Sequence, residues 1–185
     1  NWDVMGLRGT GSIDYQVPRQ FIARDYTFDV IAPVRQRGGP MFDLGIIAFA
    51  GSGHSAVVLG IAQRAMEEVV KVATVKTRPG YTGPIADNAL FREQFAHHDA
   101  ALHAAMALIQ STYAEAQRAV AAGERLTSAQ RHSYRQSAIW THRTAADIVK
   151  FCFNWGGAQS IRHPSALGRC MRDMSVAMQH VLIDP

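Results

Sequence analysis

The spacing of hydrophobic residues changes near residue 40, and this change divides the chain into two regions. In the first region, Ile13, Tyr15 and Val17 alternate with polar residues, as the residues on one face of a β-strand do. A similar alternation covers residues 26–30, and glycines and prolines surround both stretches. Residues 1–40 are therefore predicted to be strands and loops at the end of a β-domain.

From residue 41 to residue 185, apolar residues recur every three or four positions, which is the spacing of amphipathic helices. Four helices are expected, over residues 45–75, 85–121, 127–155 and 164–182. Thr127 is followed three residues later by Gln130, which is the pattern of a capping box at a helix start. Long helices with short connections indicate an antiparallel bundle. The predicted fold class is mainly α, a four-helix bundle preceded by a short β-domain remnant.

The first two helices each present one apolar face that we expect to lie in the core. On the first helix, this face contains Val58, Ile61, Ala62, Ala65, Val69 and Val72. On the second helix, it contains Leu90, Phe91, Phe95, Leu102, Met106 and Ile109. Such wide apolar faces often bury more than the core of one chain, which favours an oligomer.

Composition narrows the class of protein. Hydrophobic residues make up 48% and charged residues 18% of the chain, as in soluble proteins with large buried faces. The net charge of +4 is not gathered in blocks, so no nucleic-acid partner is expected. No signal sequence and no membrane span are expected either. Cys152 and Cys170 lie among apolar residues, which predicts two reduced, buried thiols in a cytoplasmic protein.

The two ends of the chain indicate a piece of a longer protein. Residue 1 is an asparagine within an ongoing pattern, and the chain stops at Pro185 directly after the last expected helix. We therefore expect that residues outside this chain contribute to any site that it forms.

A glycine-rich segment, residues 6–12, allows two interpretations. The backbone N–H groups of such a loop can bind phosphate when a helix follows the loop. This segment lacks the GxxxxGK[ST] pattern, and no helix is expected directly after it. A tight connection between strands is therefore the favoured interpretation.

The histidines do not have the spacing of a metal site. No two of them lie three or four residues apart, so no metal ligand is predicted. His97, His98 and His103 are expected at the edge of the bundle, with Asp99 and His103 on one helix face. The isolated histidines that we expect to be structural are His132, His142 and His163.

His180 is distinguished by its neighbours. It stands seven residues after Asp173, so a continuous helix would place the two residues on one face, two turns apart. The residues alone favour a structural role for His180, although an imidazole in a pocket could also donate a hydrogen bond or transfer a proton.

Three short motifs resemble the C-terminal bundle of the acyl-CoA dehydrogenase superfamily. Residues 60–68 resemble its first bundle helix, where a G-x-A-x-x-A pattern packs small residues against a neighbouring helix. Residues 153–157 resemble its Q-x-x-G-G segment, with Phe153 in place of the glutamine. Arg172 and Asp173 resemble the R-D pair that opens its last helix. The resemblance covers essentially the whole chain.

The resemblance implies a flavin cofactor bound between subunits. In that superfamily, an arginine after the first bundle helix reaches the flavin diphosphate, and this chain has Lys76 there, with Arg78 two residues later. The Q-x-x-G-G segment contacts the adenine half of a neighbouring subunit's flavin. Its counterparts here, which would also contact the cofactor, are Phe153, Trp155, Gly156 and Gly157. Because members are usually tetramers, a homotetramer is implied.

Departures from the dehydrogenase pattern make the chain more similar to the two-component monooxygenases, the branch that uses reduced flavin. Many dehydrogenases have a glutamate base eight residues after the R-D aspartate, where this chain has Val181, although some carry the base on another helix. Residues 51–53 are Gly-Ser-Gly where dehydrogenases often have an arginine near CoA. The monooxygenase branch has a glycine-rich segment like residues 8–12 and a histidine near the end of its last helix, matched here by His180.

The resemblance thus implies the oxygenase component of a flavin-dependent monooxygenase. A separate flavin reductase would supply FADH2 or FMNH2, and O2 would be used to hydroxylate an aromatic or heteroatom-containing substrate through a C4a-hydroperoxyflavin. His180 would be the catalytic residue. An acyl-CoA dehydrogenase or related flavin oxidase is the first alternative, and a non-catalytic helical-bundle subunit is the second. The choice of flavin and the identity of the substrate stay open.

Overall fold

The computed structural model describes residues 2–29, 35, 37–181 and 183. Its long helices are α1 (Ile46–Ala73), α2 (Ala89–Ala121) and α3 (Ser128–Gly156). The short α4 (Ala158–Ile161) and then α5 (Ala166–Ala177) follow. Three short 3-10 helices, η1 (Arg24–Tyr26), η2 (Pro40–Leu44) and η3 (Ile85–Asp87), lie before or between them. The predicted mainly α fold with long bundle helices is confirmed, and the first and third helices begin and end within two residues of the predicted bounds.

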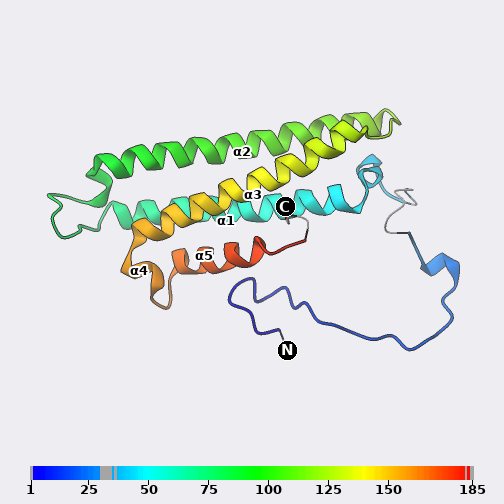
Figure 1. Ribbon diagram of the computed structural model, residues 1–185, viewed down its shortest axis with the longest axis horizontal. Coiled ribbons are helices and arrows are strands. Elements are labelled where there is room, and N and C mark those ends of the chain that lie inside the picture. The colour runs from blue at the N-terminus through cyan, green and yellow to red at the C-terminus, as the bar shows by residue number, and fades with distance from the viewer. Residues whose placement is uncertain (1, 30–34, 36, 182, 184–185) are drawn as a thin grey trace.

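The helices form a bundle with α1 and α3 as its central pair. These two helices run in the same direction and pack along each other, while α2 and α5 run in the opposite direction (Figure 1). In the described part of the chain, α2 and α5 do not contact each other, because they cover opposite sides of the central pair. The main core therefore lies between α1 and α3, with α2 and α5 closing it.

The predicted apolar face of α1 is confirmed. Val58, Ala62, Ala65 and Val69 are buried, with at most 1% exposure each. Among the described residues, α1 alone is long and apolar enough to cross a membrane by length and composition, a property that core helices of soluble proteins share. Its packing along α3 and α5 favours the role of a core helix. Gly60, which was expected to pack closely, instead has no neighbour within 4 Å of the position that a Cβ would take.

Helix α2 begins later than predicted. Residues 85–87 form the separate turn η3, and the side chain of Asn88 then caps α2 by accepting hydrogen bonds from the N–H groups of Leu90 and Phe91. This start turns Phe91 into the core and leaves Leu90 57% exposed, so the prediction for Leu90 is wrong. At the start of α3, Thr127 and Gln130 form the predicted capping box.

Both cysteines are free and buried, as predicted. The Cys152 Sγ lies 3.6 Å from the Met66 Sδ on α1. Burial raises the pKa of both thiols, which keeps them protonated and unreactive inside the bundle.

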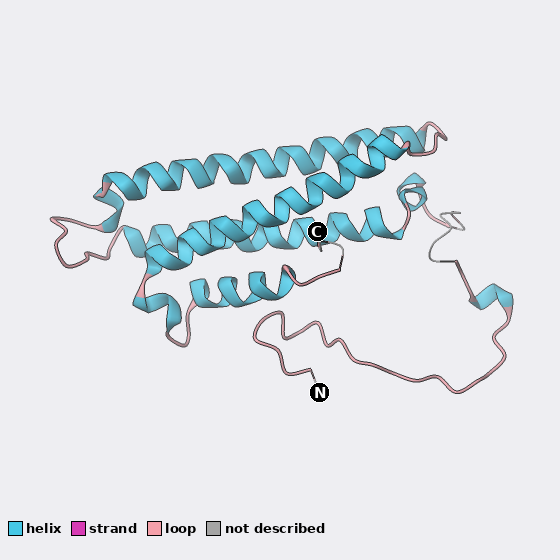
Figure 2. Cartoon of the chain, viewed as in Figure 1, coloured by secondary structure: helices cyan, strands magenta, loops and turns pink. Residues whose placement is uncertain are grey.

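The strands predicted before residue 40 are not formed in the described part of that segment, which is drawn as loop apart from single helical turns (Figure 2). Ile13 and Tyr15 are 70% and 81% exposed. A strand needs the backbone of a neighbouring strand for its hydrogen bonds, and no described segment of this chain runs beside residues 13–17 as a strand. Val30 and Pro33 lie outside the described residues. The assignment of residues 1–40 to a β-domain stays a prediction.

The glycine-rich segment docks on α5 instead of connecting two strands. The Leu7 N–H donates a hydrogen bond to the Asp173 Oδ1 over 2.7 Å, and a turn closes from Leu7 to Thr10. Gly6 lies against the backbone of Arg172, where a Cβ would have no room. No helix follows in the next residues, so the phosphate-loop interpretation has no support.

Helix α5 is shorter than predicted at both ends. It begins after Ser165, whose hydroxyl caps the Gly168 N–H, and it ends at Ala177. Arg172 and Asp173 therefore lie in its second half and do not open it. The chain turns after Met178, and this turn inserts Ile183 into the core with 4% exposure. His180 stands on the turn, so the prediction that it shares a helix face with Asp173 is wrong.

Candidate functional site

The C-terminal end of α3 brings together the residues that were expected to contact a cofactor. The helix ends at Gly156, and Gly157 takes a positive φ of 62° that side chains other than glycine rarely adopt. A Cβ on Gly156 would overlap the side chains of Ser160 and Leu167. Each glycine thus has a structural reason to be there, whether or not a cofactor approaches.

Lys76 and Arg78 reach this helix end from the loop after α1. The Lys76 Nζ donates a hydrogen bond to the Gly156 carbonyl over 2.9 Å. An Arg78 Nη donates to the carbonyls of Trp155 and Asn154 over 2.7 and 3.1 Å. The last carbonyls of a helix carry partial negative charge, so two cations stabilise this end. Both side chains stay half-exposed.

Trp155 and Phe153 complete the cluster in different ways. The buried Trp155 ring lies under the Arg78 guanidinium, with 4.7 Å between the guanidinium carbon and the ring centre. Its Nε1–H donates to the Gln94 Oε1 on α2 over 2.9 Å. Phe153 is half-buried, and its carbonyl accepts a hydrogen bond from the Ser160 hydroxyl. We call Lys76, Arg78, Phe153, Trp155, Gly156 and Gly157 the helix-end cluster.

An open pocket of about 500 Å³ lies beside the helix-end cluster, between α2 and α3. Its lining contains Glu93, Gln94, His97, His98, Asp147, Lys150, Phe151, Asn154 and Trp155. The His98 ring lies 4.4 Å from the Phe151 ring, centre to centre, and partial burial and then the neighbouring His97 lower the His98 pKa. His103 pairs with Asp99 over 3.7 Å, as their spacing predicts. No group of three or more potential metal ligands occurs among the described residues.

Two histidine rings lie against each other toward the other end of α1. The His180 ring on the C-terminal turn contacts the His54 ring on α1, with 3.8 Å between ring centres and 39° between ring planes. Burial, and then the charge of His180, lower the His54 pKa. Sequence reasoning missed His54, although it directly follows the Gly-Ser-Gly segment that replaces a dehydrogenase arginine.

A third histidine lies close enough to the pair for the charges of His54 and His180 to affect it. His142 on α3 is fully buried, and its Nδ1 is 2.7 Å from the Ala138 carbonyl, so this nitrogen must carry the proton. Burial is the main cause that lowers the His142 pKa. The hydrogen bond to Ala138 raises this pKa, whereas the charges of His54 and His180 lower it further. The His142 Nε2 is buried without a hydrogen-bond partner, as are the hydroxyls of Ser55 and Thr141. His54, His142 and His180 are called the histidine cluster below.

The family of the chain follows from its bundle. Residues 52–185 match the family model described as Acyl-CoA dehydrogenase, C-terminal domain. The chain belongs to this acyl-CoA dehydrogenase family. The resemblance inferred from the sequence motifs is thereby confirmed.

Curated relatives within the family are monooxygenases. An indole-3-acetate monooxygenase of Pseudomonas putida is 30% identical over 188 residues, which cover 98% of this chain and 46% of the relative. The flavin-dependent monooxygenase oxygenase subunit HsaA of Rhodococcus jostii is 24% identical over 192 residues, covering 100% and 50%. This acyl-CoA dehydrogenase-type chain therefore spans about half the length of the curated relatives it matches.

Solved structures show the same fold. The HsaA monooxygenase from M. tuberculosis superposes with a TM-score of 0.87 at 21% identity, covering 100% of this chain and 50% of that one. XiaF from Streptomyces, solved with FADH2 and glycerol, gives a TM-score of 0.74 at 20% identity over 79% of this chain and 37% of XiaF. The described part of the chain thus has the fold of these solved structures.

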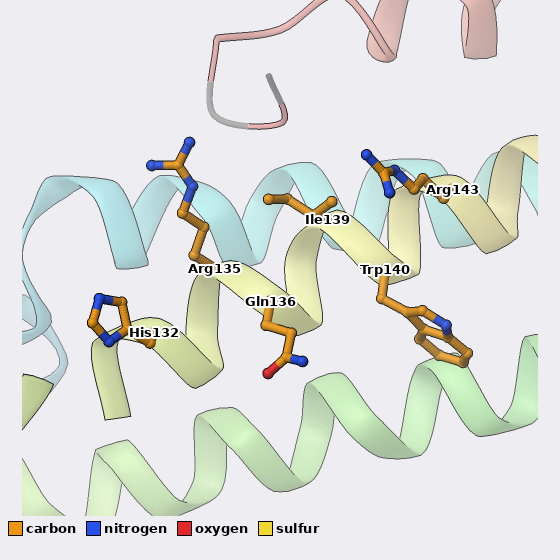
Figure 3. A pocket seen from close by; sticks show the side chains of 6 residues that line it. All are labelled: His132, Arg135, Gln136, Ile139, Trp140 and Arg143. Carbon is orange, nitrogen blue, oxygen red and sulfur yellow. The ribbon is translucent and has the colours of Figure 1, made fainter. Parts of the chain in front are cut away.

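One further pocket has no counterpart in the predicted site of this family. It measures about 450 Å³ and lies along the first half of α3, where Arg135, Ile139 and Arg143 point to one side and Gln136 and Trp140 point toward α2 (Figure 3). The residues expected to contact flavin lie elsewhere, in the helix-end cluster. We assign this pocket no role in the site.

Proposed function

We propose that the full-length protein is the oxygenase component of a two-component flavin-dependent monooxygenase. The observation that carries the proposal is the histidine cluster. Position 181, where many dehydrogenases have a glutamate base, is a valine that is 75% exposed, and the nearby side chain that faces α1 is the imidazole of His180. An imidazole suits hydrogen bonding and proton transfer with an oxygen-bearing substrate better than removal of an α-proton from a thioester.

The cofactor in this proposal is a reduced flavin. Bound flavin supplies the electrons that activate O2. His180 holds or moves a proton at the substrate oxygen, and Ile183, which is 4% exposed, anchors the turn that carries His180. FADH2 is the first candidate, since Trp155 and Phe153 offer aromatic surface for an adenine and XiaF is a structural neighbour solved with FADH2.

The helix-end cluster fits a second contact with flavin. Lys76 and Arg78 each keep donors beyond those used on the α3 carbonyls, and both are half-exposed next to Gly157, which has no side chain. An arriving diphosphate would meet two positive charges and an open backbone there. We propose flavin contacts by Lys76, Arg78, Phe153, Trp155, Gly156 and Gly157.

The separation of the two clusters favours a homotetramer with shared sites. From His54 to Ala73 at the end of α1 the helix rises about 28 Å, which exceeds the length of an extended FAD molecule. One flavin therefore cannot contact both clusters of the same chain. Each chain would instead offer His180 to one flavin and the helix-end cluster to another. The proposed partners are further copies of this chain, a flavin reductase, O2 and a small aromatic substrate, in the cytoplasm.

The test is an anaerobic titration of the full-length protein with FADH2 and FMNH2, followed by admission of O2. Aromatic acids, beginning with indole-3-acetate because a relative acts on it, serve as substrates, and product and H2O2 are both measured. Stoichiometric binding of reduced flavin with hydroxylated product supports the proposal. Tight binding of oxidised FAD that an acyl-CoA reduces would identify a dehydrogenase, and absence of binding in both redox states would leave a bundle subunit.

A further inference from the structure

The C-terminal turn, of which residues 178–181 and 183 are described, places His180 beyond the end of α5. The His180 N–H donates to the Ala177 carbonyl over a long 3.4 Å, and the Ile183 N–H donates to the His180 carbonyl over 2.9 Å. Ile183 anchors the turn by its burial. A side chain on a turn samples more orientations than one on a helix, so contacts of the His180 ring decide where the imidazole points.

We propose that His54 is a positioning residue, whose ring lies against the His180 ring and holds it in the orientation that the proposed oxygenation uses. This inference rests on the proposed function for its catalytic meaning. The contact itself is a property of the chain alone. With 3.8 Å between their centres and 39° between their planes, the two tilted rings are in van der Waals contact.

His54 is suited to this task because its own position is fixed. It lies in the third turn of α1, between the buried residues Gly51 and Ser55. Helix α1 packs along both α3 and α5, so the His54 ring is attached to the most firmly packed element of the bundle. A ring on a rigid helix can therefore orient a ring on a turn.

Charge gives the pair a second constraint. Two imidazolium rings in contact would repel strongly at the low effective dielectric of a half-buried site. His142 is buried and neutral in its Nδ1–H tautomer, and its pKa is lowered by burial first. Burial and the neighbouring His180 also lower the His54 pKa, which favours a state in which His54 contacts His180 as a neutral ring.

The experiment compares crystal structures and turnover of the full-length protein with three variants at residue 54. His54→Ala and His54→Gln remove the ring, whereas His54→Phe keeps an aromatic ring that cannot take a proton. His132→Ala, at an exposed histidine on α3, is the matched control. The readouts are the rotamer and order of the His180 ring, the Kd of reduced flavin, and the ratio of product to O2 consumed.

We expect the His180 ring to leave its orientation in His54→Ala and His54→Gln, with the ratio of product to O2 falling roughly two- to tenfold. His54→Phe should restore both readouts, and the Kd of reduced flavin should stay unchanged in all variants. An unmoved His180 ring in His54→Ala, or a His54→Phe protein as uncoupled as His54→Ala, would overturn the proposal. If the parent protein forms no product, the proposed function fails, while the orientation of His180 still decides the positioning role.

Discussion

The two ends of α1 differ in how their polar groups are satisfied. At the helix-end cluster, the described cationic side chains donate to backbone carbonyls, and both glycines are required by packing or by backbone geometry. At the histidine cluster, the rings of His54 and His180 lie against each other with 3.8 Å between their centres, and the buried His142 Nε2 has no hydrogen-bond partner among the described residues. Hydrogen bonds and packing account for the first end, whereas contact between titratable rings characterises the second.

This difference indicates where function constrains the sequence most directly. In our proposal, the contact between His54 and His180 serves the chemistry of that region. Residues of the helix-end cluster serve stability and, in our proposal, binding at once. Substitutions at the histidine cluster should therefore change the ratio of product to O2 consumed. Substitutions at the helix-end cluster should change folding stability or flavin affinity.

The largest expected effect is that of His180→Ala. Product formation should fall by about 10²-fold or more because a positioned acid–base group is lost, while reduced flavin still binds and H2O2 replaces product. Stopped-flow and peroxide assays on the full-length protein measure both quantities. Unchanged coupling would remove His180 from the mechanism and the histidine cluster from the proposed site.

A glycine substitution tests the claim that packing explains the other end. Gly156→Ala should lower the free energy of unfolding by about 1–3 kcal/mol, because its Cβ would overlap Ser160 and Leu167. Gly60→Ala is the control, since nothing lies within 4 Å of its Cβ position, and it should raise stability by about 0.5–1 kcal/mol. Urea unfolding of both variants decides, and equal stabilities would contradict the packing argument.

Removal of the Arg78 guanidinium tests whether the helix-end cluster binds flavin as well as stabilising the end of α3. Arg78→Ala should weaken FADH2 about tenfold through the loss of a charged hydrogen bond. FMNH2, which lacks the diphosphate and adenine, should be affected less. Arg78→Lys should recover only part of the affinity, since lysine cannot stack flat on Trp155. Arg92→Ala, at an exposed arginine, serves as control, and parallel losses for the two flavins would argue against an adenine contact.

The smallest expected effect is a pH dependence of stability from His142. Burial lowers its pKa in the folded protein below the value near 6.5 of an unfolded histidine. The unfolded chain therefore binds more protons as the pH falls below about 6.5, so this contribution to stability is present above that pH and is lost below it. His142→Gln should flatten the dependence between about pH 7.5 and pH 5 in urea unfolding. A slope identical to that of the parent protein would assign the effect to other groups.

Local patterns predicted most of the bundle. The apolar spacing of α1 and the capping box at Thr127 are properties of neighbouring residues, so they could be read without tertiary information. The alternating pattern before residue 40 does not by itself establish strands, because a β-strand needs the backbone of a neighbouring strand for its hydrogen bonds. The end of α5 was missed since the turn that buries Ile183 is a tertiary effect.

The sequence predicted the residues of the candidate site that lie in recognisable motifs. The resemblance named all residues of the helix-end cluster, and the structure brings these segments together although Lys76 and Gly156 are 80 residues apart. His54 lay in no motif, and its importance arises only when the C-terminal turn returns to α1. Contacts between distant segments of this kind leave no periodic signal in a single sequence.

The distance of about 28 Å along α1 has a genetic consequence. If each flavin takes His180 from one chain and Arg78 from another, two inactive alleles can rescue each other. Co-expression of His180→Ala chains with Arg78→Ala chains would produce mixed assemblies in which some sites inherit both intact residues. The length of a single helix would then be visible as intragenic complementation, with activity returning in cells that carry two defective copies of the gene.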